Sequence, residues 1–350
     1  MKKILYIDPF SSHSHINFNK IYIDALKNHK VELDFAFKED YAKKIGITER
    51  CYDIPSKFFL KGNNGWKNRI SQIRMLIFLN RKLKFKKYDM ILLSSFDEIS
   101  LFFSFVNANF VLINHNNLIG LGSFVKRFFY KLISKDNIQI VFEHFMKEYL
   151  FSLGIKNVME IKHGFLEKFD ENILVENDFV NGLNLTRFRK IIFAPSSSSG
   201  DKSFFMELLT DANIQKKLEE NSILLILKGD FVIGQNGNIK VISEYLSENQ
   251  YRYLFIHSDI ILIKYKDSFQ YRTSGVFWEC VANNKLFLLS RIEAFIDFQK
   301  FVRFDPFFNG KHDFIDKILE LYKLNEDLTE NPFINKDKLR PNFEELLITN

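Results

Sequence analysis

The arrangement of apolar residues along this chain constrains its fold more than any other feature. Short aliphatic and β-branched runs alternate with stretches of helical periodicity, which is the pattern of successive βαβ units. Strands are predicted at residues 4–7, 31–35, 90–93, 110–113, 138–142 and 157–161, and then at 191–194, 223–227, 260–263 and 286–289. Helices are predicted at residues 17–27, 66–85, 98–105, 123–134 and 143–153, and then at 202–209, 248–255, 275–282 and 313–322. Because strands that are apolar throughout are typical of parallel sheets, the chain is predicted to be an α/β protein.

A length of 350 residues suits two domains better than one. The segment 169–189 interrupts the alternation, since it is polar and only weakly periodic. We therefore predict a first domain at residues 1–170, a linker at 171–189, a second domain at 190–330 and a C-terminal segment at 331–350. Two doubly wound domains that face each other across a cleft are the simplest arrangement.

The cysteine content and the apolar stretches bear on the compartment. Cys51 and Cys280 cannot form a disulfide framework, which favours a reducing, cytoplasmic setting. Asp8 and Pro9 end the N-terminal apolar run too early for a signal peptide. The apolar stretch 101–113 falls short of the roughly 18 residues that span a bilayer, so any membrane contact is predicted to be peripheral.

Positive charge gathers in the first half of the chain. Residues 54–88 contain ten lysines and arginines and no acid, and apolar residues recur there at near-helical spacing from Trp66 to Leu83. A basic amphipathic helix of this kind can lie on an anionic membrane, here through residues 57–87, or it can pack on the core and expose a charged outer face. Residues 124–135 form a second, weaker case. Nucleic acid is not expected as a partner, because no recognised nucleic-acid-binding motif accompanies the charge.

Ligands of parallel α/β sheets bind outside the carboxyl ends of the strands, where helix N-termini favour anions. The strand 191–194 is followed by a loop rich in hydroxyl groups, and the strand 223–227 is followed by a lysine and a glycine. Both ends can donate hydrogen bonds to phosphate, although each also fits an ordinary polar turn. The candidate phosphate ligands at these two ends are Ser196, Ser197, Lys202 and Lys228.

A third strand end carries a more specific pattern. Arg272, Ser274 and Gly275 follow the strand 260–263 and open a predicted helix, and Glu279 lies one turn into that helix. Free amide groups and a forked guanidinium suit a diphosphate, and a carboxylate can accept hydrogen bonds from both ribose hydroxyls. A first-turn acid also complements the helix dipole, but the combination of residues favours a nucleotide site.

This stretch resembles the donor-binding region of the GT-B glycosyltransferases, and most closely the retaining family 4 type. In that family an aspartate-led strand, a loop, a Ser-Gly pair and a helix that carries glutamate follow one another, as they do from Asp259 to Glu279 here. In the first half, the strand 110–113 leads to His115, which resembles the family's histidine that contacts the donor sugar. Tyr271 stands where the family has the first of two acids, so retention or inversion stays open.

The resemblance implies a metal-independent hexosyltransferase built from two Rossmann-like domains. The first domain would bind the acceptor, and the second would bind a UDP- or GDP-sugar as substrate, with no further cofactor. Arg272, Lys228 and the amides of Ser274 and Gly275 would stabilise the departing diphosphate. The last helix, near residues 336–347, would return to the first domain.

Three side chains of the first domain are candidates for catalysis. His15 follows the first strand, where inverting GT-B enzymes carry a general base, and His115 occupies the retaining-type position. Asp97 is a rival base at another strand end. His13 is expected to be only a strand-end hydrogen-bonding residue, and His163 is expected in a loop at the cleft floor.

Three classes of function remain open from the sequence. The first is a glycosyltransferase that acts on a glycan or lipid-linked glycan acceptor in bacterial surface polysaccharide assembly. The second is a sugar-nucleotide epimerase with the same architecture, and the third is a carbohydrate-binding module without activity.

Overall fold

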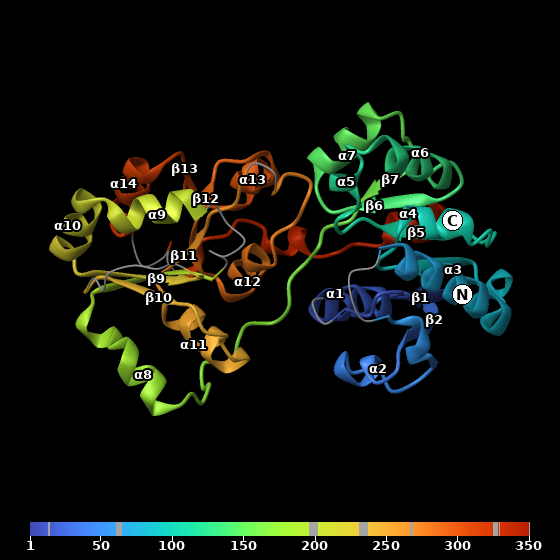
Figure 1. Ribbon diagram of the computed structural model, residues 1–350, viewed down its shortest axis with the longest axis horizontal. Coiled ribbons are helices and arrows are strands. Elements are labelled where there is room, and N and C mark those ends of the chain that lie inside the picture. Colours follow the sequence, from blue (N-terminus) through green and yellow to red (C-terminus); the bar gives the residue numbers. More distant parts are fainter. Residues whose placement is uncertain are drawn as a thin grey trace. The chain divides into compact units, whose positions relative to one another are not determined.

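The structure is a computed structural model that describes residues 1–12, 15–60, 65–195, 202–230, 237–266, 269–324, 328 and 330–349 (Figure 1). The chain divides into two compact units. The first unit comprises Met1–Gly164, Tyr271–Thr273 and Leu339–Asn350, and the second comprises Phe165–Gln270 and Ser274–Lys338.

The first unit is built on a parallel sheet, which has seven strands in the described part of the chain. Their order is β3-β2-β1-β4-β5-β6-β7. The strands are β1 (Lys2–Ile7), β2 (Val31–Lys38), β3 (Cys51–Ile54), β4 (Met90–Leu93), β5 (Phe110–Ile113), β6 (Ile138–Val141) and β7 (Val158–Glu160). Every residue of β4 and β5 is buried, because helices cover both faces of the sheet.

The helices of the first unit are α1 (Ile16–Lys27), α2 (Tyr41–Lys44), α3 (Gly65–Leu83), α4 (Glu98–Phe103), α5 (Asn117–Gly120), α6 (Phe124–Ile133), α7 (His144–Ser152) and α16 (Glu344–Thr349). The basic helix α3 packs Met75, Leu76 and Leu79 into the core, while Arg81 and Lys82 face outward. Of the two alternatives for this helix, the structure therefore supports core packing along its middle. No helix within the described ranges is both long and apolar enough to cross a membrane.

The second unit is built on another parallel sheet, with six strands among the residues that the structure describes. Their order is β10-β9-β8-β11-β12-β13. The strands are β8 (Lys190–Ala194), β9 (Ile223–Lys228), β10 (Ile239–Ile242), β11 (Ile260–Ile263), β12 (Leu286–Ser290) and β13 (Phe307–Phe308). Successive residues of β8 show the two covered faces: Ile192 joins the core under α9, α10 and α14, whereas Phe193 contacts Tyr251 of α11.

The helices of the second unit are α8 (Asn177–Leu183), α9 (Lys202–Thr210), α10 (Ala212–Glu220), α11 (Glu248–His257), α12 (Gly275–Asn283), α13 (Glu293–Ile296) and α14 (Lys311–Leu321). Figure 1 shows α9, α10 and α14 on one side of this sheet and α11 on the other. Side-chain caps define the starts of three of these helices: Asp211 accepts hydrogen bonds at the start of α10, Ser247 forms a capping box with Gln250 at the start of α11, and Ser274 caps α12.

The structure confirms the α/β class and every strand that the apolar runs predicted. Short elements such as β3, β10, β13 and α10 were not predicted, and helix α8 lies within the segment that was assigned to the linker. The single helix expected at residues 336–347 is wrong. That segment holds a 3₁₀ turn at Lys336–Leu339 and the separate helix α16, because Pro341 cannot continue a helix and disfavours helical backbone before it. Phe343 and Leu346 lie in the core of the first unit.

Candidate functional site

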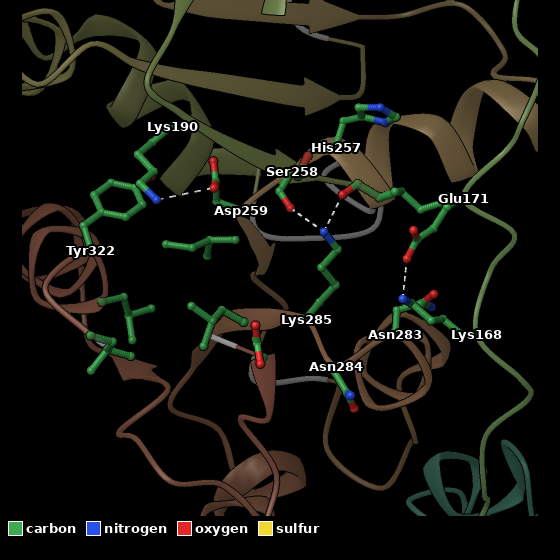
Figure 2. Close-up of a pocket in the computed structure, with 16 residues that line it drawn as sticks. Lys168, Glu171, Lys190, His257, Ser258, Asp259, Asn283, Asn284, Lys285 and Tyr322 are labelled. Carbon is green, nitrogen blue, oxygen red and sulfur yellow. Dashed lines mark hydrogen bonds and ion pairs between the residues drawn. The ribbon is translucent and has the colours of Figure 1, made fainter. Parts of the chain in front are cut away.

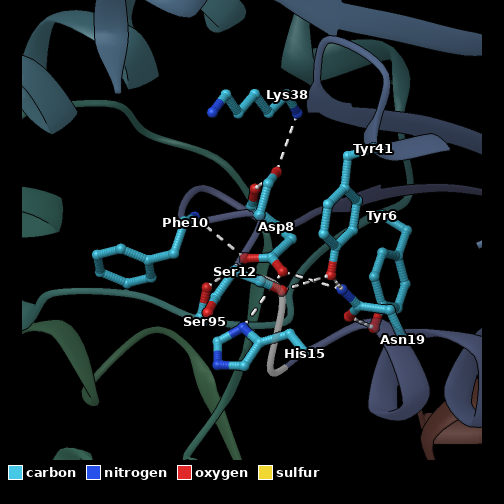
Figure 3. Close-up of polar contacts among 10 residues, drawn as sticks. Tyr6, Asp8, Phe10, Ser12, His15, Asn19, Lys38, Tyr41 and Ser95 are labelled. Carbon is cyan, nitrogen blue, oxygen red and sulfur yellow. Dashed lines mark hydrogen bonds and ion pairs between the residues drawn. The ribbon is translucent and has the colours of Figure 1, made fainter. Parts of the chain in front are cut away.

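A buried carboxylate lies at the carboxyl edge of the first sheet. Asp8 directly follows β1, and its neighbour strand β4 ends at the same level, since Ile7 pairs with Leu93. The Asp8 carboxylate accepts hydrogen bonds from the hydroxyl of Ser95 at 2.6 Å, the amide of Asn19 at 2.9 Å and the backbone N–H of Phe10 at 3.1 Å (Figure 3). Three donors from different elements therefore hold this carboxylate in one orientation.

The same carboxylate orients a histidine. His15 immediately precedes α1, and its Nδ1 lies 3.3 Å from Oδ2 of Asp8 (Figure 3). Because an ionised carboxylate only accepts hydrogen bonds, the His15 proton belongs on Nδ1, which leaves Nε2 as an acceptor. Burial on its own would raise the pKa of Asp8, but hydrogen bonds from His15, Ser95 and Asn19 outweigh it and lower that pKa. Asp8 and His15 thus form a carboxylate–histidine pair that is able to take up a proton at Nε2.

A second histidine stacks on the first. The rings of His15 and His115 are nearly parallel, with 4.8 Å between their centroids, and Phe18 meets His115 edge-on at 4.2 Å. Burial, together with His15 and His163, lowers the pKa of His115 well below 6.5. Burial also lowers the pKa of His163 to about 4, and its Nδ1 donates to the carbonyl of Gly164 at 2.9 Å. His115 and His163 are therefore neutral near pH 7, which allows His115 to stack on His15 without charge repulsion.

Asp97, the third catalytic candidate, has a structural role in this unit. It is the N-cap of α4, where it accepts from the backbone N–H and the hydroxyl of Ser100, each at 2.8 Å. It also pairs with Arg69 at 3.3 Å. The structure thus brings His15 and His115 together and gives Asp97 separate partners, while His13 lies outside the described residues.

In the second unit, α12 begins at the carboxyl edge of the sheet. Ser274 is its N-cap: the buried hydroxyl accepts from the backbone N–H of Phe277 at 3.2 Å and lies 3.2 Å from the hydroxyl of Tyr265. A Cβ atom added at Gly275 would meet no other atom within 4 Å. The space beside the Gly275 Cα is therefore open, at the end of the helix where an anionic group is favoured.

Glu279 and a tyrosine form a hydrogen bond on the inner side of α12. The hydroxyl of Tyr251, on α11, donates to Oε2 of Glu279. Burial raises the pKa of Glu279 from 4.5 to about 7, and the bond from Tyr251 and the nearby Arg252 only partly oppose it. Sequence reasoning identified Glu279 but missed Tyr251, because nothing local in α11 marks a residue that acts through another helix.

Glutamine at position 279 is expected to change how the stability of the second unit depends on pH. The folded chain holds a proton on Glu279 between about pH 4.5 and 7, where the unfolded chain has lost it. The contribution of Glu279 to the free energy of unfolding is therefore fully present below pH 4.5 and is lost as the pH rises through 7. The unaltered protein should therefore lose on the order of 2 kcal/mol of unfolding free energy between pH 4.5 and pH 8. Glu279→Gln should not show this loss, because glutamine does not titrate.

Urea unfolding at a series of pH values measures this difference, and Glu219→Gln, at an exposed position on α10, is the matched control. Parallel curves for Glu279→Gln and the unaltered protein would contradict a raised pKa at this carboxylate.

The remaining phosphate-site candidates are placed as follows. Lys228 ends β9 and donates to the carbonyl of Ser243 at 3.3 Å, and Lys202 is the exposed first residue of α9. Arg272 is exposed in the short segment Tyr271–Thr273, which clusters with the first unit. Ser196 and Ser197 lie outside the described residues.

A cavity of about 510 Å³ lies at the opposite, amino edge of the second sheet. The first residues of β8 and β12, Lys190 and Leu286, contribute to its wall. Two of its lysines already have partners: Lys190 pairs with Asp259 at 3.5 Å, and Lys285 donates to the carbonyl of Ser258 at 2.8 Å (Figure 2). Because ligands of parallel sheets bind at the carboxyl edge, this cavity is not the expected nucleotide site.

Across the described ranges, no three or more His, Cys, Asp or Glu side chains are grouped so that they could hold a metal ion. Cys280 is buried and Cys51 is partly exposed, and both are free thiols.

No protein-family model matches the chain, and no curated protein matches it either. Solved structures do match. Anabaena Alr3699/HepE in complex with UDP-glucose has a TM-score of 0.62 at 12% identity, covering 100% of both chains. A glycosyltransferase from Rickettsia africae has a TM-score of 0.59 at 14% identity, covering 100% of this chain and 94% of its own.

An epimerase matches to a similar degree. UDP-GlcNAc 2-epimerase from Neisseria meningitidis bound to UDP-GlcNAc has a TM-score of 0.58 at 13% identity, covering 99% of this chain and 100% of its own. These structures and this chain share two parallel α/β units over essentially their full lengths. The chain therefore has the GT-B fold, with two Rossmann-like units.

Proposed function

We propose that this protein is a glycosyltransferase that moves a sugar from a nucleotide-sugar to a glycan or lipid-linked glycan. One observation carries the proposal: α12 begins with a capped N-terminus that has open space beside Gly275, and it holds a buried carboxylate one turn further on. That arrangement offers amides to a diphosphate and an acceptor for both hydroxyls of a ribose. UDP-sugars are the first donors to test, because Alr3699/HepE was solved with UDP-glucose.

The phosphates of the donor would be met by positive charge and backbone amides. The amides at Ser274 and Gly275 lie at the positive end of the α12 dipole, and Lys228 ends a strand at the same edge of the sheet. Arg272 precedes this N-terminus by two residues. As the bond between the sugar and the diphosphate breaks, these groups would stabilise the charge that develops on the leaving phosphate.

The first unit would bind the acceptor, and the Asp8–His15 pair would act as general base. Nε2 of His15 would take the proton of the acceptor hydroxyl while the hydroxyl oxygen attacks the anomeric carbon. Asp8 would hold the imidazole in the required tautomer and stabilise the imidazolium, as carboxylates do in other catalytic pairs. This assignment implies inversion at the anomeric carbon, whereas a role for His115 against the donor sugar would fit retention.

A sugar-nucleotide epimerase is the second candidate, because the UDP-GlcNAc 2-epimerase shares the fold over the whole chain. The two candidates differ in what happens without an acceptor. An epimerase converts the nucleotide-sugar to its epimer, whereas a transferase leaves it intact or hydrolyses it slowly. Chromatography of UDP-sugars incubated with the protein alone distinguishes them.

Nucleotide binding is expected to depend on Glu279. A nucleotide present at about 100 times its dissociation constant adds about 2.7 kcal/mol of stability, so one of UDP, GDP, ADP, TDP and CMP should raise the melting temperature. The shift should be absent in Glu279→Ala and retained in Glu219→Ala. It should also grow as the pH rises through about 7, since the ionised carboxylate accepts from both ribose hydroxyls.

Thermal unfolding with each nucleotide, at pH 6 and pH 8, measures both effects. No shift with any nucleotide would contradict the transferase and the epimerase together, and a shift that survives Glu279→Ala would move the site away from α12.

A further inference from the structure

Aromatic side chains are exposed on one face of the first unit. They come from the end of α4, the residues after it and the outer face of α6, and they form what we call the aromatic surface. It consists of four phenylalanines and one adjoining valine: Phe103 (40% exposed), Phe105 (80%), Phe124 (76%), Phe128 (51%) and Val125 (53%). Side chains of this kind are normally buried, and apolar residues gathered in one place on a surface indicate an interaction site.

These side chains form one continuous patch. Phe129 of α6 contacts α4, with its ring centroid 5.2 Å from that of Phe103 and 5.4 Å from that of Phe128. Phe105 lies 6.4 Å from Phe103, and Phe124 is one helical turn from Phe128. The patch therefore crosses from α4 to α6 without interruption.

The opposite side of α6 is anchored, so its aromatic face cannot turn inward. Tyr130 is fully buried and donates to Oδ1 of Asn114 at 2.8 Å. Lys126 pairs with the buried Glu98 of α4 at 3.6 Å. Packing of the unit thus holds Phe124 and Phe128 in solvent.

The local backbone does not account for the most exposed of these residues. Phe105 has a φ of 51°, a conformation in which Asn and Gly are favoured over an aromatic residue. An 80% exposed phenylalanine at such a position serves neither the turn nor the core.

The segment that carries the patch has charges of a single sign. Between Glu98 and Asp136 the chain contains no acidic residue, and α6 and the residues just after it supply Lys126, Arg127, Lys131 and Lys135. An apolar face beside lysines and arginines is the combination by which peripheral proteins bind anionic lipid.

We propose that the aromatic surface docks on an anionic lipid bilayer, with Phe105, Phe124 and Phe128 inserted at the headgroup level and Lys131 and Lys135 against lipid phosphates. The contact would thus lie on α4 and α6, whereas α3 turns the apolar side of its middle to the core. This inference extends the proposed function, since it would bring the first unit to a lipid-linked acceptor, but it does not depend on nucleotide binding.

Sedimentation with vesicles tests the docking. The protein should bind vesicles that contain phosphatidylglycerol, bind more weakly to vesicles of phosphatidylcholine alone, and be released by salt. The double variant Phe105→Asn, Phe128→Gln keeps residues suited to each backbone position and should lower the affinity at least about tenfold, because each exposed ring loses its transfer to lipid. Lys131→Gln with Lys135→Gln should lower the affinity for the anionic vesicles only.

The matched control replaces two exposed apolar residues elsewhere, Leu174→Ser and Ile348→Ser, and should bind as the unaltered protein does. All variants should keep the melting temperature and its shift with nucleotide, so a failed donor site and a failed docking surface give different results.

Three outcomes would overturn the proposal. The first is unchanged vesicle binding by the Phe105→Asn, Phe128→Gln variant. The second is loss of binding only on replacement of Lys82, Lys84, Lys86 and Lys87 by glutamine, which would locate the contact on the basic end of α3. The third is no vesicle binding, with a dimer in solution that the phenylalanine variant converts to a monomer, which would make the patch an interface between copies of the chain.

Discussion

Asp8→Asn is expected to lower the rate of sugar transfer by about 10³-fold while nucleotide binding to the second unit is unchanged. The carboxylate fixes the Nδ1–H tautomer of His15 from 3.3 Å, and an asparagine amide can instead donate to Nδ1 and put the proton on Nε2. Nε2 would then no longer accept the proton of the acceptor hydroxyl. Steady-state kinetics should show a fall in kcat with little change in the KM for the donor.

His15→Gln and His115→Gln separate the two mechanisms for this site. A base at His15 requires His15→Gln to lose as much activity as Asp8→Asn, with His115→Gln affected less. The reverse order would assign the chemistry to His115 and favour retention. Full activity in Asp8→Asn would contradict a role for the pair altogether.

Folding of the Asp8 variant has to be measured alongside its activity. The pKa of Asp8 is lowered in the folded protein, so its carboxylate contributes stability at neutral pH that is lost as the pH falls through that lowered pKa. The asparagine variant lacks this contribution, and its melting temperature should fall. His15→Gln leaves the three other donors to Asp8 in place, so it tests the chemistry with a smaller effect on stability.

Gly164→Ala is expected to destabilise the first unit by about 2–4 kcal/mol. Gly164 has a φ of +78°, and a Cβ added there would lie 2.6 Å from Cδ of Pro341 and 2.7 Å from Cγ2 of Ile21. The substitution would therefore strain the backbone and push the C-terminal segment away from α1. Denaturant unfolding measures the loss of stability.

Gly154→Ala is a matched control for this effect. Gly154 has nearly the same φ, +80°, but an added Cβ would meet nothing within 4 Å. It should lose only about 1 kcal/mol from the backbone, so the difference between the two variants isolates the contact with Pro341 and Ile21. Equal losses would show that the C-terminal segment yields without cost, and Pro341→Ala should recover part of the loss in Gly164→Ala if the contact is the cause.

Much of the fold followed from local patterns. Strands such as β4 and β5 are apolar at every position, and this property of a strand buried on both faces is visible in four consecutive residues. The short elements β3, β10 and β13 were missed because two to four residues of mixed polarity carry no period. Their pairing partners lie elsewhere in the chain and determine that they are strands.

The relative positions of the residues proposed for the donor site could be predicted for a similar reason. Ser274, Gly275 and Glu279 lie within six residues, so one helix determines their relative positions once the Ser274 cap is made. The sequence marks Asp8 as a candidate site residue more weakly: it is an acid that directly follows the first buried strand and precedes His15 by seven residues. The orientation of its carboxylate depends on Ser95 and Asn19, which reach it from other elements.

The sequence by itself determined the α/β class, the order of the strands along the chain and the strand ends at which ligands are expected, because these depend on periodicities within one segment. Only the tertiary structure decided that His15 and His115 stack, that Tyr251 meets Glu279, and that the aromatic residues of α4 and α6 face solvent. Each of these features depends on residues that are far apart in the chain. Their distances are determined only when the helices pack on the sheets. The same packing determined which apolar faces were buried: it covered the apolar side of the middle of α3 and left the aromatic surface exposed.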